Sequence, residues 1–353
     1  MNSSDPQGNL IVSHVSIKGI VSCVPPEIKE NHQFGEFFSN SEVDAVCKFT
    51  GVRERRIASE NVSTGDLGLR ASQTLLKTLD WRPDSIDALI FLSQTPDFLF
   101  PPTALRLHGH LGCKNECVAF DVNLGCSGYP YALFIGAKLL DGMNIKRALV
   151  VVGDTISKVV DEADRATALL FGDAATATAL EYCSEGLESC EFELGSDGSG
   201  YSNLAVPGSG FNRGLADILE TRQKCYRPGK LFMDGTAVME FTLSRVSEVL
   251  KKYLSREEST KTDYFLLHQA NRFIIQTLIK KLKVDENKFL FNIERFGNTS
   301  SASIPLLMTT NLQQFRSSPL NLCLLGFGVG YSWAMATITL NPACHLEMIE
   351  YDI

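Results

Sequence analysis

Cys126 lies in a segment whose residues could activate a thiol for nucleophilic chemistry. In Asp121-Val-Asn-Leu-Gly-Cys126-Ser-Gly-Tyr129 an apolar strand ends, a glycine permits a sharp turn, and the cysteine opens a helix. Unpaired backbone N–H groups and the positive end of the helix dipole favour a thiolate there, which predicts a lowered pKa. The same amides can stabilise an oxyanion. The alternative interpretation is a small buried apolar residue at a helix N-terminus.

A histidine and an asparagine further along the chain could complete a catalytic site. His268 follows a short apolar strand and precedes a helix, at the place where open α/β sheets have their ligand crevice. Asn298 lies in the turn Gly-Asn-Thr-Ser-Ser-Ala-Ser-Ile-Pro, which is rich in small polar residues. Taken alone, the histidine can be structural and the asparagine a turn or capping residue.

Short apolar runs alternate with amphipathic segments along the whole chain. We predict strands at residues 10–24, 88–94, 117–122, 147–154, 174–180, 264–267, 321–325 and 331–340, and helices at 66–79, 101–111, 126–140, 237–254, 271–282 and 303–315. This alternation predicts an α/β fold with a largely parallel sheet covered on both faces. Glycine-rich loops at 195–214 and a polar stretch at 222–230 join two halves, and residues 342–353 are expected to form an appended tail.

The composition fits a globular protein and excludes several other classes. The chain has 353 residues, 44% of them hydrophobic, and its net charge of −8 suggests no nucleic-acid partner. The polar N-terminus lacks a signal pattern, and the apolar runs fall far below the roughly 20 residues of a membrane span. We therefore expect a cytoplasmic protein with no membrane contact and with reduced cysteines. His108-Gly-His110 is interpreted as structural, so no metal site is predicted.

A series of short motifs follows in order along residues 15–340. They are Gly51-Val-Arg-Glu-Arg-Arg-Ile57, Asp-Val-Asn-Leu-Gly-Cys126-Ser-Gly, Asp164-Arg165, Phe171-Gly-Asp-Ala-Ala175, His268-Gln-Ala-Asn271, Gly-Asn298-Thr-Ser-Ser-Ala-Ser-Ile-Pro305 and Gly326-Phe-Gly-Val-Gly-Tyr-Ser-Trp333. Together they resemble the ketoacyl-acyl-carrier-protein synthase III family of the thiolase superfamily. The resemblance implies a homodimer with a five-layered αβαβα fold of two pseudo-duplicated halves. Residues 1–185 would carry the cysteine, and residues 186–353 the histidine and asparagine.

The resemblance also implies a role for each site residue. Cys126 would carry the acyl group, and its N–H and another from the turn Gly328-Val329-Gly330 would form the oxyanion hole. His268 and Asn298 would stabilise the enolate left when a malonyl thioester loses carbon dioxide, and Phe327 resembles the aromatic residue that favours this step. The substrates would be acyl-coenzyme A or acyl-carrier protein with malonyl-carrier protein, and no cofactor would be needed. The product would be a 3-oxoacyl thioester for fatty-acid or specialised acyl or polyketide biosynthesis.

The sequence departs from the family pattern where the acyl donor binds. The family usually stacks the adenine of coenzyme A on a tryptophan with an arginine opposite. This chain has Ala45 at the tryptophan position and Phe49 at a nearby position that is usually basic, whereas Arg165 is retained, so half of the adenine clamp is lost. We therefore expect an unusual acyl donor, either coenzyme A bound differently or an acyl-carrier protein. Val329 replaces a common glycine, which predicts strain if its φ is positive.

Further residues are assigned by resemblance to substrate or partner contacts. Arg272, Lys280 and Lys281 are candidates for docking a carrier protein, although Glu240 stands where a lysine is common; the alternative is a solvated helix face. Phe100 lies on a loop that in the family crosses the dimer interface and limits the acyl pocket. The alternative is that this aromatic residue only packs the interface.

Three other functional classes were weighed. An acyltransferase would move the acyl group from Cys126 to an alcohol or amine, but such transfer alone does not require Asn298. A degradative thiolase needs a second active cysteine, and Cys323 is not in the expected motif. A non-catalytic scaffold would not need all three reactive residues. A decarboxylating condensing enzyme is therefore the leading hypothesis.

Overall fold

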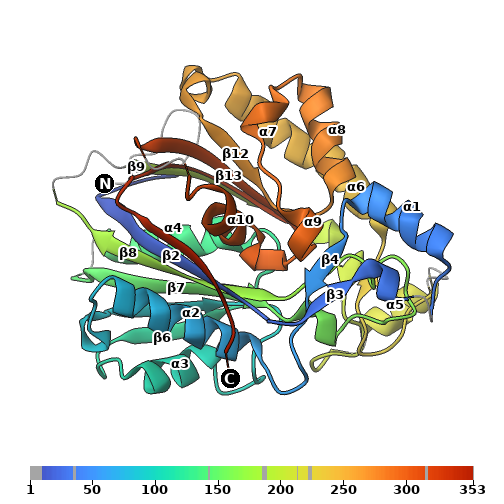
Figure 1. The fold of residues 1–353 in the computed structure, drawn as a ribbon, viewed down its shortest axis with the longest axis horizontal. Coiled ribbons are helices and arrows are strands. Elements are labelled where there is room, and N and C mark those ends of the chain that lie inside the picture. The colour runs from blue at the N-terminus through green and yellow to red at the C-terminus, as the bar shows by residue number, and fades with distance from the viewer. Residues whose placement is uncertain are drawn as a thin grey trace.

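The chain folds into five layers, which alternate between helices and sheets (Figure 1). The computed structural model describes residues 10–34, 37–141, 144–184, 189–212, 214–221, 225–314 and 317–352. Two large sheets lie face to face with one helical layer between them and one outside each. The predicted thiolase-like αβαβα architecture is confirmed.

The first sheet has six described strands in the order β15-β2-β8-β7-β5-β6. These strands are β2 (Val15–Val24), β5 (Ala88–Leu92), β6 (Val118–Val122), β7 (Arg147–Asp154), β8 (Ala174–Tyr182) and β15 (His345–Glu350). Every residue of β5 is buried, because helices cover both faces of the sheet; this explains its uninterrupted apolar sequence. β6 lies at one edge of the sheet.

The second sheet has five described strands in the order β1-β9-β14-β13-β12. They are β1 (Leu10–Ser13), β9 (Ser189–Ser196), β12 (Tyr264–Leu267), β13 (Leu320–Gly328) and β14 (Ser332–Leu340). Two small ribbons lie beside the layers: β3 (Ile28–Glu30) pairs with β4 (Glu54–Arg56), and β10 (Leu204–Ala205) with β11 (Phe232–Met233).

The central helical layer consists of α4 (Gly128–Leu140) and α10 (Ser303–Asn311) (Figure 1). Tyr129 and Leu133 of α4 and Leu307 of α10 share one core cluster with strands of both sheets. Because a sheet packs on each side, these helices are apolar around most of their circumference. This layer fixes the start of α4, and with it the segment that carries Cys126.

The outer layers use helices with one apolar face. α2 (Thr64–Thr78) and α3 (Thr103–Leu111) cover the first sheet, and α6 (Gly235–Phe241), α7 (Ser247–Leu254) and α8 (Arg272–Leu282) cover the second. The remaining helices, α1 (Asn40–Thr50), α5 (Gly214–Thr221) and α9 (Ile293–Phe296), lie to one side of the layers (Figure 1). No helix among the described residues is long and apolar enough to cross a membrane.

The prediction of a largely parallel sheet is wrong. β5 pairs in parallel with β6 and β7, but β8 is antiparallel to both of its neighbours, and β14 is antiparallel to β13 and β9. The reason is that neither connection contains an α-helix that could serve as a parallel crossover: β7 and β8 are joined through the 3-10 helix Ile156–Lys158, and β13 and β14 by a short turn.

The prediction of an appended C-terminal tail is also wrong. Residues 345–350 form β15, which pairs in parallel with β2, while β1 near the other terminus pairs with β9 of the second sheet. Each terminus thus adds a strand to the sheet of the opposite half. The predicted boundary between residues 185 and 186 lies outside the described residues and stays a prediction.

The predicted helix at 237–254 is interrupted. α6 and α7 are joined by a π-helical turn, Thr242–Val246, rather than forming one regular α-helix. The last predicted helix ends at Asn311, and its predicted end at residue 315 lies outside the described residues. No disulfide joins the described cysteines, and their reduced state stays a prediction.

Candidate active site

Cys126 lies at the bottom of a cleft, between the end of β6 and the start of α4. Its side chain is buried, with 7% exposed. The Gly128 N–H donates to the Gly125 carbonyl at 2.7 Å, which closes the turn, and α4 begins at Gly128, two residues later than predicted. A side chain at position 125 would meet Gln94, since a Cβ there would lie 2.1 Å from Gln94 Oε1. The turn glycine therefore lets Gln94 pack beside the cysteine.

Two backbone N–H groups surround the sulfur. Those of Cys126 and Val329 both interact with the Cys126 thiol, as expected for an oxyanion hole. A Cβ on Gly328 would lie 2.6 Å from Cys126 Cβ, so only glycine allows this approach. Val329 is not among the described residues with positive φ, whereas Gly330 has φ +129°. The predicted strain at Val329 is therefore absent, because the unusual conformation falls on the following glycine.

The prediction that the Cys126 pKa is lowered is wrong for the unliganded site. Burial raises the pKa of this thiol to about 12, and the nearby Asp154 charge acts in the same direction. The Ser300 hydroxyl, 3.9 Å from Sγ, and the two backbone N–H groups act the other way without offsetting the burial. The loss of water around the sulfur outweighs the favourable dipoles. The resting thiol is consequently neutral at physiological pH.

His268 is fully enclosed and also neutral. Burial lowers the pKa of its imidazole to about 3, so the ring carries no charge near pH 7. Nδ1 lies 2.7 Å from Ser303 Oγ, and the ring meets Phe327 edge-on with centroids 5.6 Å apart. Because a hydroxyl both donates and accepts, Ser303 can support either neutral tautomer.

Asn298 is fixed through both its backbone and its side chain. Its N–H donates to the Leu170 carbonyl at 2.9 Å, and its own carbonyl accepts from Gly172 N–H at 3.1 Å. Its Oδ1 accepts from the Ser300 N–H at 2.9 Å, which sets the orientation of the amide. Nδ2 is therefore the group that remains to donate to a ligand in the cleft.

Ser300 and Asp154 are site residues that the sequence analysis missed. Ser300 has φ +50°, and it contacts Cys126, His268, Asn298 and Asp154. The Asp154 carboxylate is completely buried and accepts from Ser93 Oγ, the Gln94 N–H, the Thr95 N–H and hydroxyl, and Ser301 Oγ. Burial raises its pKa despite these donors. The motif Gly-Asp-Thr at the end of β7 gave no sign of this role, since a strand-end aspartate is more often a turn residue.

Two cavities meet at Cys126. The larger, about 720 Å³, is lined by Cys126, His268, Asn298 and Phe327, and it opens toward α1 and α8. The smaller, about 190 Å³, lies on the other side of the cysteine and is lined in part by Gln94, Asn123 and Val329. The predicted catalytic residues therefore share one cleft, and Cys126 lines both cavities.

The residues predicted to bind the acyl donor line the larger cavity. Ala45, Phe49 and Arg165 are all among them. Phe49 stacks on Phe273 at 4.7 Å between ring centroids, and Arg165 forms an ion pair with Glu42 at 3.4 Å. The structure thus brings the donor-site positions together, and Phe49, at the position that was expected to be basic, forms an aromatic pair with Phe273.

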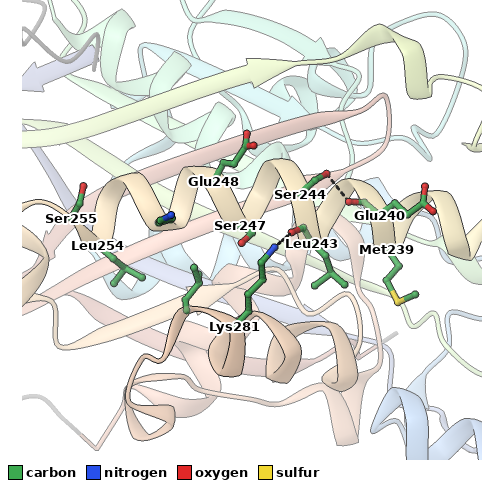
Figure 2. Close-up of a pocket in the computed structure, with 11 residues that line it drawn as sticks. Met239, Glu240, Leu243, Ser244, Ser247, Glu248, Leu254, Ser255 and Lys281 are labelled. Atoms are coloured by element: carbon green, nitrogen blue, oxygen red, sulfur yellow. Dashed lines mark hydrogen bonds between the residues drawn. The ribbon is translucent and has the colours of Figure 1, made fainter.

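The candidate docking residues lie on or beside α8, outside the cleft. Lys281 reaches across to α6–α7 and donates from Nζ to the Leu243 carbonyl at 2.5 Å (Figure 2). It lines a separate groove of about 980 Å³ together with Glu240 and Glu248. Arg272 lies 3.9 Å from Glu294, and Lys280 is exposed. A carrier-binding role for these residues stays a prediction.

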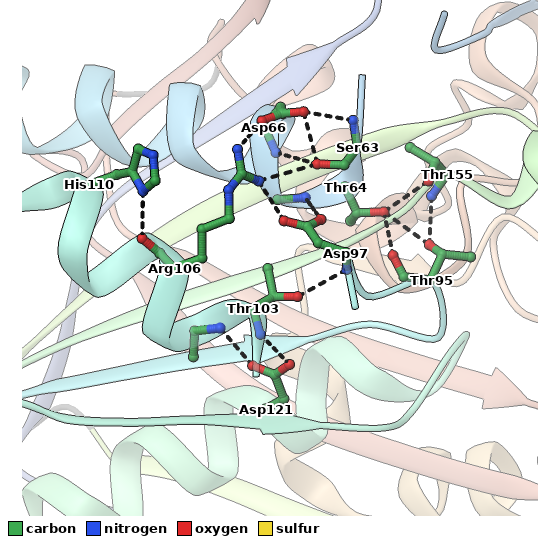
Figure 3. A network of polar contacts seen from close by, with 12 residues as sticks. Ser63, Thr64, Asp66, Thr95, Asp97, Thr103, Arg106, His110, Asp121 and Thr155 are labelled. Carbon is green, nitrogen blue, oxygen red and sulfur yellow. Dashed lines mark hydrogen bonds and ion pairs between the residues drawn. The ribbon is translucent and has the colours of Figure 1, made fainter. Parts of the chain in front are cut away.

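Phe100 lies on a projecting loop and lines neither cavity of its own chain. It is 79% exposed, beside the equally apolar Phe98 and Leu99. The base of this loop is held by a polar network, in which Asp97 accepts from Arg106 and from the Gly65 N–H while Thr103 Oγ1 accepts from the Asp97 N–H (Figure 3). The predicted part of Phe100 in an acyl pocket stays a prediction.

Comparisons with known proteins agree with this site. Residues 120–198 match the family model for 3-oxoacyl-[acyl-carrier-protein] synthase III, and residues 255–340 match the model for its C-terminal part. A β-ketoacyl-[acyl-carrier-protein] synthase III from Prochlorococcus marinus strain MIT 9215 is 33% identical over 92% of this chain and 96% of its own. A crystal structure of a 3-oxoacyl-(acyl-carrier protein) synthase from Burkholderia xenovorans LB400 is 44% identical, covers 97% of this chain and 99% of its own, and superposes with a TM-score of 0.92. The priming β-ketosynthase of the R1128 polyketide pathway is 27% identical, covers 94% and 97%, and has a TM-score of 0.80. The family models, the sequence identity over most of the chain and the shared fold show that the chain belongs to the 3-oxoacyl-[acyl-carrier-protein] synthase III family.

Proposed function

We propose that the protein is a transferase that condenses an acyl thioester with malonyl-acyl-carrier protein to give a 3-oxoacyl thioester. The observation that carries this proposal is the convergence of Cys126, His268 and Asn298 on one 720 Å³ cleft. A nucleophile alone would serve acyl transfer, whereas the additional pair of neutral donors suits a step in which negative charge appears on a thioester oxygen. One relative named above is the priming β-ketosynthase of a polyketide pathway, and the proposal includes both fatty-acid biosynthesis and polyketide priming for this protein.

In the first step, Cys126 takes the acyl group from its donor. Because the thiol is neutral at rest, its proton must leave as the sulfur–carbon bond forms. His268, uncharged and in the same cleft, accepts this proton and returns it to the departing carrier thiol. The N–H groups of Cys126 and Val329 stabilise the tetrahedral oxyanion.

In the second step, the malonyl thioester loses carbon dioxide and forms a carbon–carbon bond. This step uses the neutral tautomer in which the Ser303 hydroxyl donates to His268 Nδ1, so that Nε2–H and Asn298 Nδ2 donate to the enolate oxygen. The first step uses the other neutral tautomer, in which Nδ1–H donates to Ser303 Oγ and Nε2 is free to accept the Cys126 proton. The enolate carbon attacks the acyl carbonyl, the carbon–sulfur bond breaks, and the departing Cys126 thiolate takes up one proton from solvent as the product leaves, which regenerates the thiol. Phe327, packed against His268, keeps water from this side of the cleft. These groups suffice for the reaction, so the proposal includes no cofactor and no metal.

The acyl donor in this proposal is a carrier protein. Recognition of coenzyme A needs cations for its phosphates and a surface that stacks on adenine, but Ala45 and Phe49 offer no charge and Arg165 is paired with Glu42. A pantetheine arm on a carrier protein requires only the narrow apolar cleft. Arg272 and Lys280, beside the cleft on α8, would contact the acidic carrier. The predicted cytoplasmic location stays a prediction.

The proposal also includes a homodimer. β6 lies at the edge of its sheet, where unpaired backbone groups can pair with a second copy. The projecting loop adds Phe98, Leu99 and Phe100, three large apolar side chains that are each at least half exposed. A second copy that covers β6 would bury them, and the molar mass in solution tests this: a monomer would contradict it.

Intact-protein mass spectrometry tests the function directly. Incubation with an acyl thioester should add one acyl mass, and Cys126→Ser should abolish this addition. Asn298→Ala should keep the acylation and reduce the release of carbon dioxide from malonyl-carrier protein about 100-fold, as expected for loss of one donor to an oxyanion. A label on another residue, or normal condensation by Asn298→Ala, would contradict the mechanism.

A further inference from the structure

Two side-chain amides in the smaller cavity have no hydrogen-bond partner among the described residues. Gln94 and Asn123 both line this cavity, and neither amide makes a hydrogen bond to another described residue. The other polar groups there are occupied: Thr95 Oγ1 donates to Asp154, Ser209 Oγ donates to the Val206 carbonyl, and Ser300 interacts with Asp154 and Cys126. The two amides are thus the polar groups left for a ligand.

Gln94 is held next to the nucleophile. Its backbone N–H donates to Asp154 Oδ1 at 2.7 Å, and its side chain packs over Gly125, the residue before Cys126. Gln94 is half-buried, whereas Asn123 is exposed after the end of β6. An acyl group carried by Cys126 and directed into this cavity would therefore meet the Gln94 carboxamide within its first few atoms.

The size and charge of the cavity limit what can enter. Its volume of about 190 Å³ corresponds to roughly six groups the size of a water molecule. No charged side chain of the described residues lines it, and Ile156, Leu204 and Leu231 form apolar parts of its wall. A long alkyl chain does not fit, and a carboxylate would find no cation among the described lining residues.

From these contacts we infer that Gln94 selects a short, uncharged acyl group that bears a hydroxyl or oxo substituent near the thioester. This inference rests on the proposed function and names its acyl substrate class. A carboxamide both donates and accepts, so it complements a hydroxyl or a carbonyl. A plain alkyl chain of the same length would cover the Gln94 amide and leave the amide without any partner. The acylation rate with such an alkyl group should therefore be roughly 5- to 100-fold lower.

The test compares acylation of Cys126 by small thioesters that need no carrier protein. The probes are the N-acetylcysteamine thioesters of 3-hydroxybutyrate, acetoacetate, butyrate and octanoate, and the rate of acyl addition is followed by intact mass. The wild-type protein should favour the hydroxy or oxo group over butyrate at least about 5-fold and should react slowest with octanoate. Gln94→Leu should remove or reverse this preference, and Gln94→Ala should remove it and admit longer chains. The matched control Gln73→Leu changes an exposed glutamine on α2 and should behave as wild type.

Each outcome is decisive. Equal rates for butyrate and 3-hydroxybutyrate with the wild-type protein would overturn the inference, and so would an unchanged preference in both Gln94 variants. Fast acylation by octanoate would overturn the size limit. If no thioester labels Cys126 at all, the proposed function itself fails and the inference falls with it.

Discussion

Gly328→Ala tests how tightly the oxyanion turn is fitted to the nucleophile. The added Cβ would lie 2.6 Å from Cys126 Cβ and 3.1 Å from Sγ, whereas ordinary carbon contacts are about 3.5–4.0 Å. Neither side can turn away, because Cys126 Cβ is fixed by its own backbone and Gly328 is the last residue of β13. The turn and the cysteine must therefore separate by about 1 Å. A displacement of that size in a catalytic arrangement costs roughly 100-fold in rate, and overpacking costs about 1–3 kcal/mol of stability.

The assay is the rate at which one acyl mass appears on Cys126, together with the free energy of unfolding in denaturant. Gly109→Ala is the matched control, since a Cβ at this helical position has nothing within 4 Å. It should leave the acylation rate unchanged and stabilise the protein by about 0.5–1 kcal/mol through helix propensity. If Gly328→Ala acylates at the wild-type rate, the contact between the turn and the nucleophile does not position the oxyanion hole.

Two further predictions concern the buried charges of the site. Asp154→Asn replaces a carboxylate oxygen, which accepts from the Gln94 and Thr95 N–H groups, by an NH2 group that can only donate. The free energy of unfolding in denaturant should therefore fall by about 2–3 kcal/mol. The exposed control Asp84→Asn should leave it unchanged. Alkylation of Cys126, followed by peptide mapping, should rise about tenfold per pH unit from pH 7 to pH 10 without a plateau, because its pKa is about 12 and only the thiolate reacts. A plateau below pH 8 would show that the resting thiol is already ionised.

The sequence was informative wherever a local pattern determines geometry. Cys126, His268 and Asn298 each follow a strand or turn signal, and the structure places all three in one cleft. Apolar runs and glycines mark where such strands end, and both can be read from the sequence. The relative directions of the strands could not be predicted as well, because the apolar run of β8 does not show whether this strand pairs parallel or antiparallel with its neighbours.

The features of the site and of the sheets that the sequence did not predict depend on burial and on contacts between distant segments. The pKa of Cys126 follows from the loss of water around it, which outweighs the turn amides that the sequence revealed. Ser300 has φ +50°, a conformation that cannot be predicted from the presence of a serine. Its partner Asp154 lies nearly 150 residues earlier in the sequence. The strand β15 was missed because a short segment such as His345–Glu350 shows its role only when β2 is placed beside it.

The burial of Cys126 follows a consistent chemical logic. An enolate is quenched by any nearby proton donor, and an acyl-cysteine is hydrolysed by any nearby water, so the site must exclude solvent. Exclusion raises the thiol pKa and lowers that of His268, and both shifts favour neutral resting groups. A neutral thiol beside a neutral imidazole can then transfer one proton as the acyl group arrives, and no net charge needs to be buried beforehand. The fixed dipoles of the turn and of Asn298 stabilise charge only when the reaction creates it. The high pKa of Cys126 is therefore compatible with catalysis, since solvent exclusion is what both intermediates require.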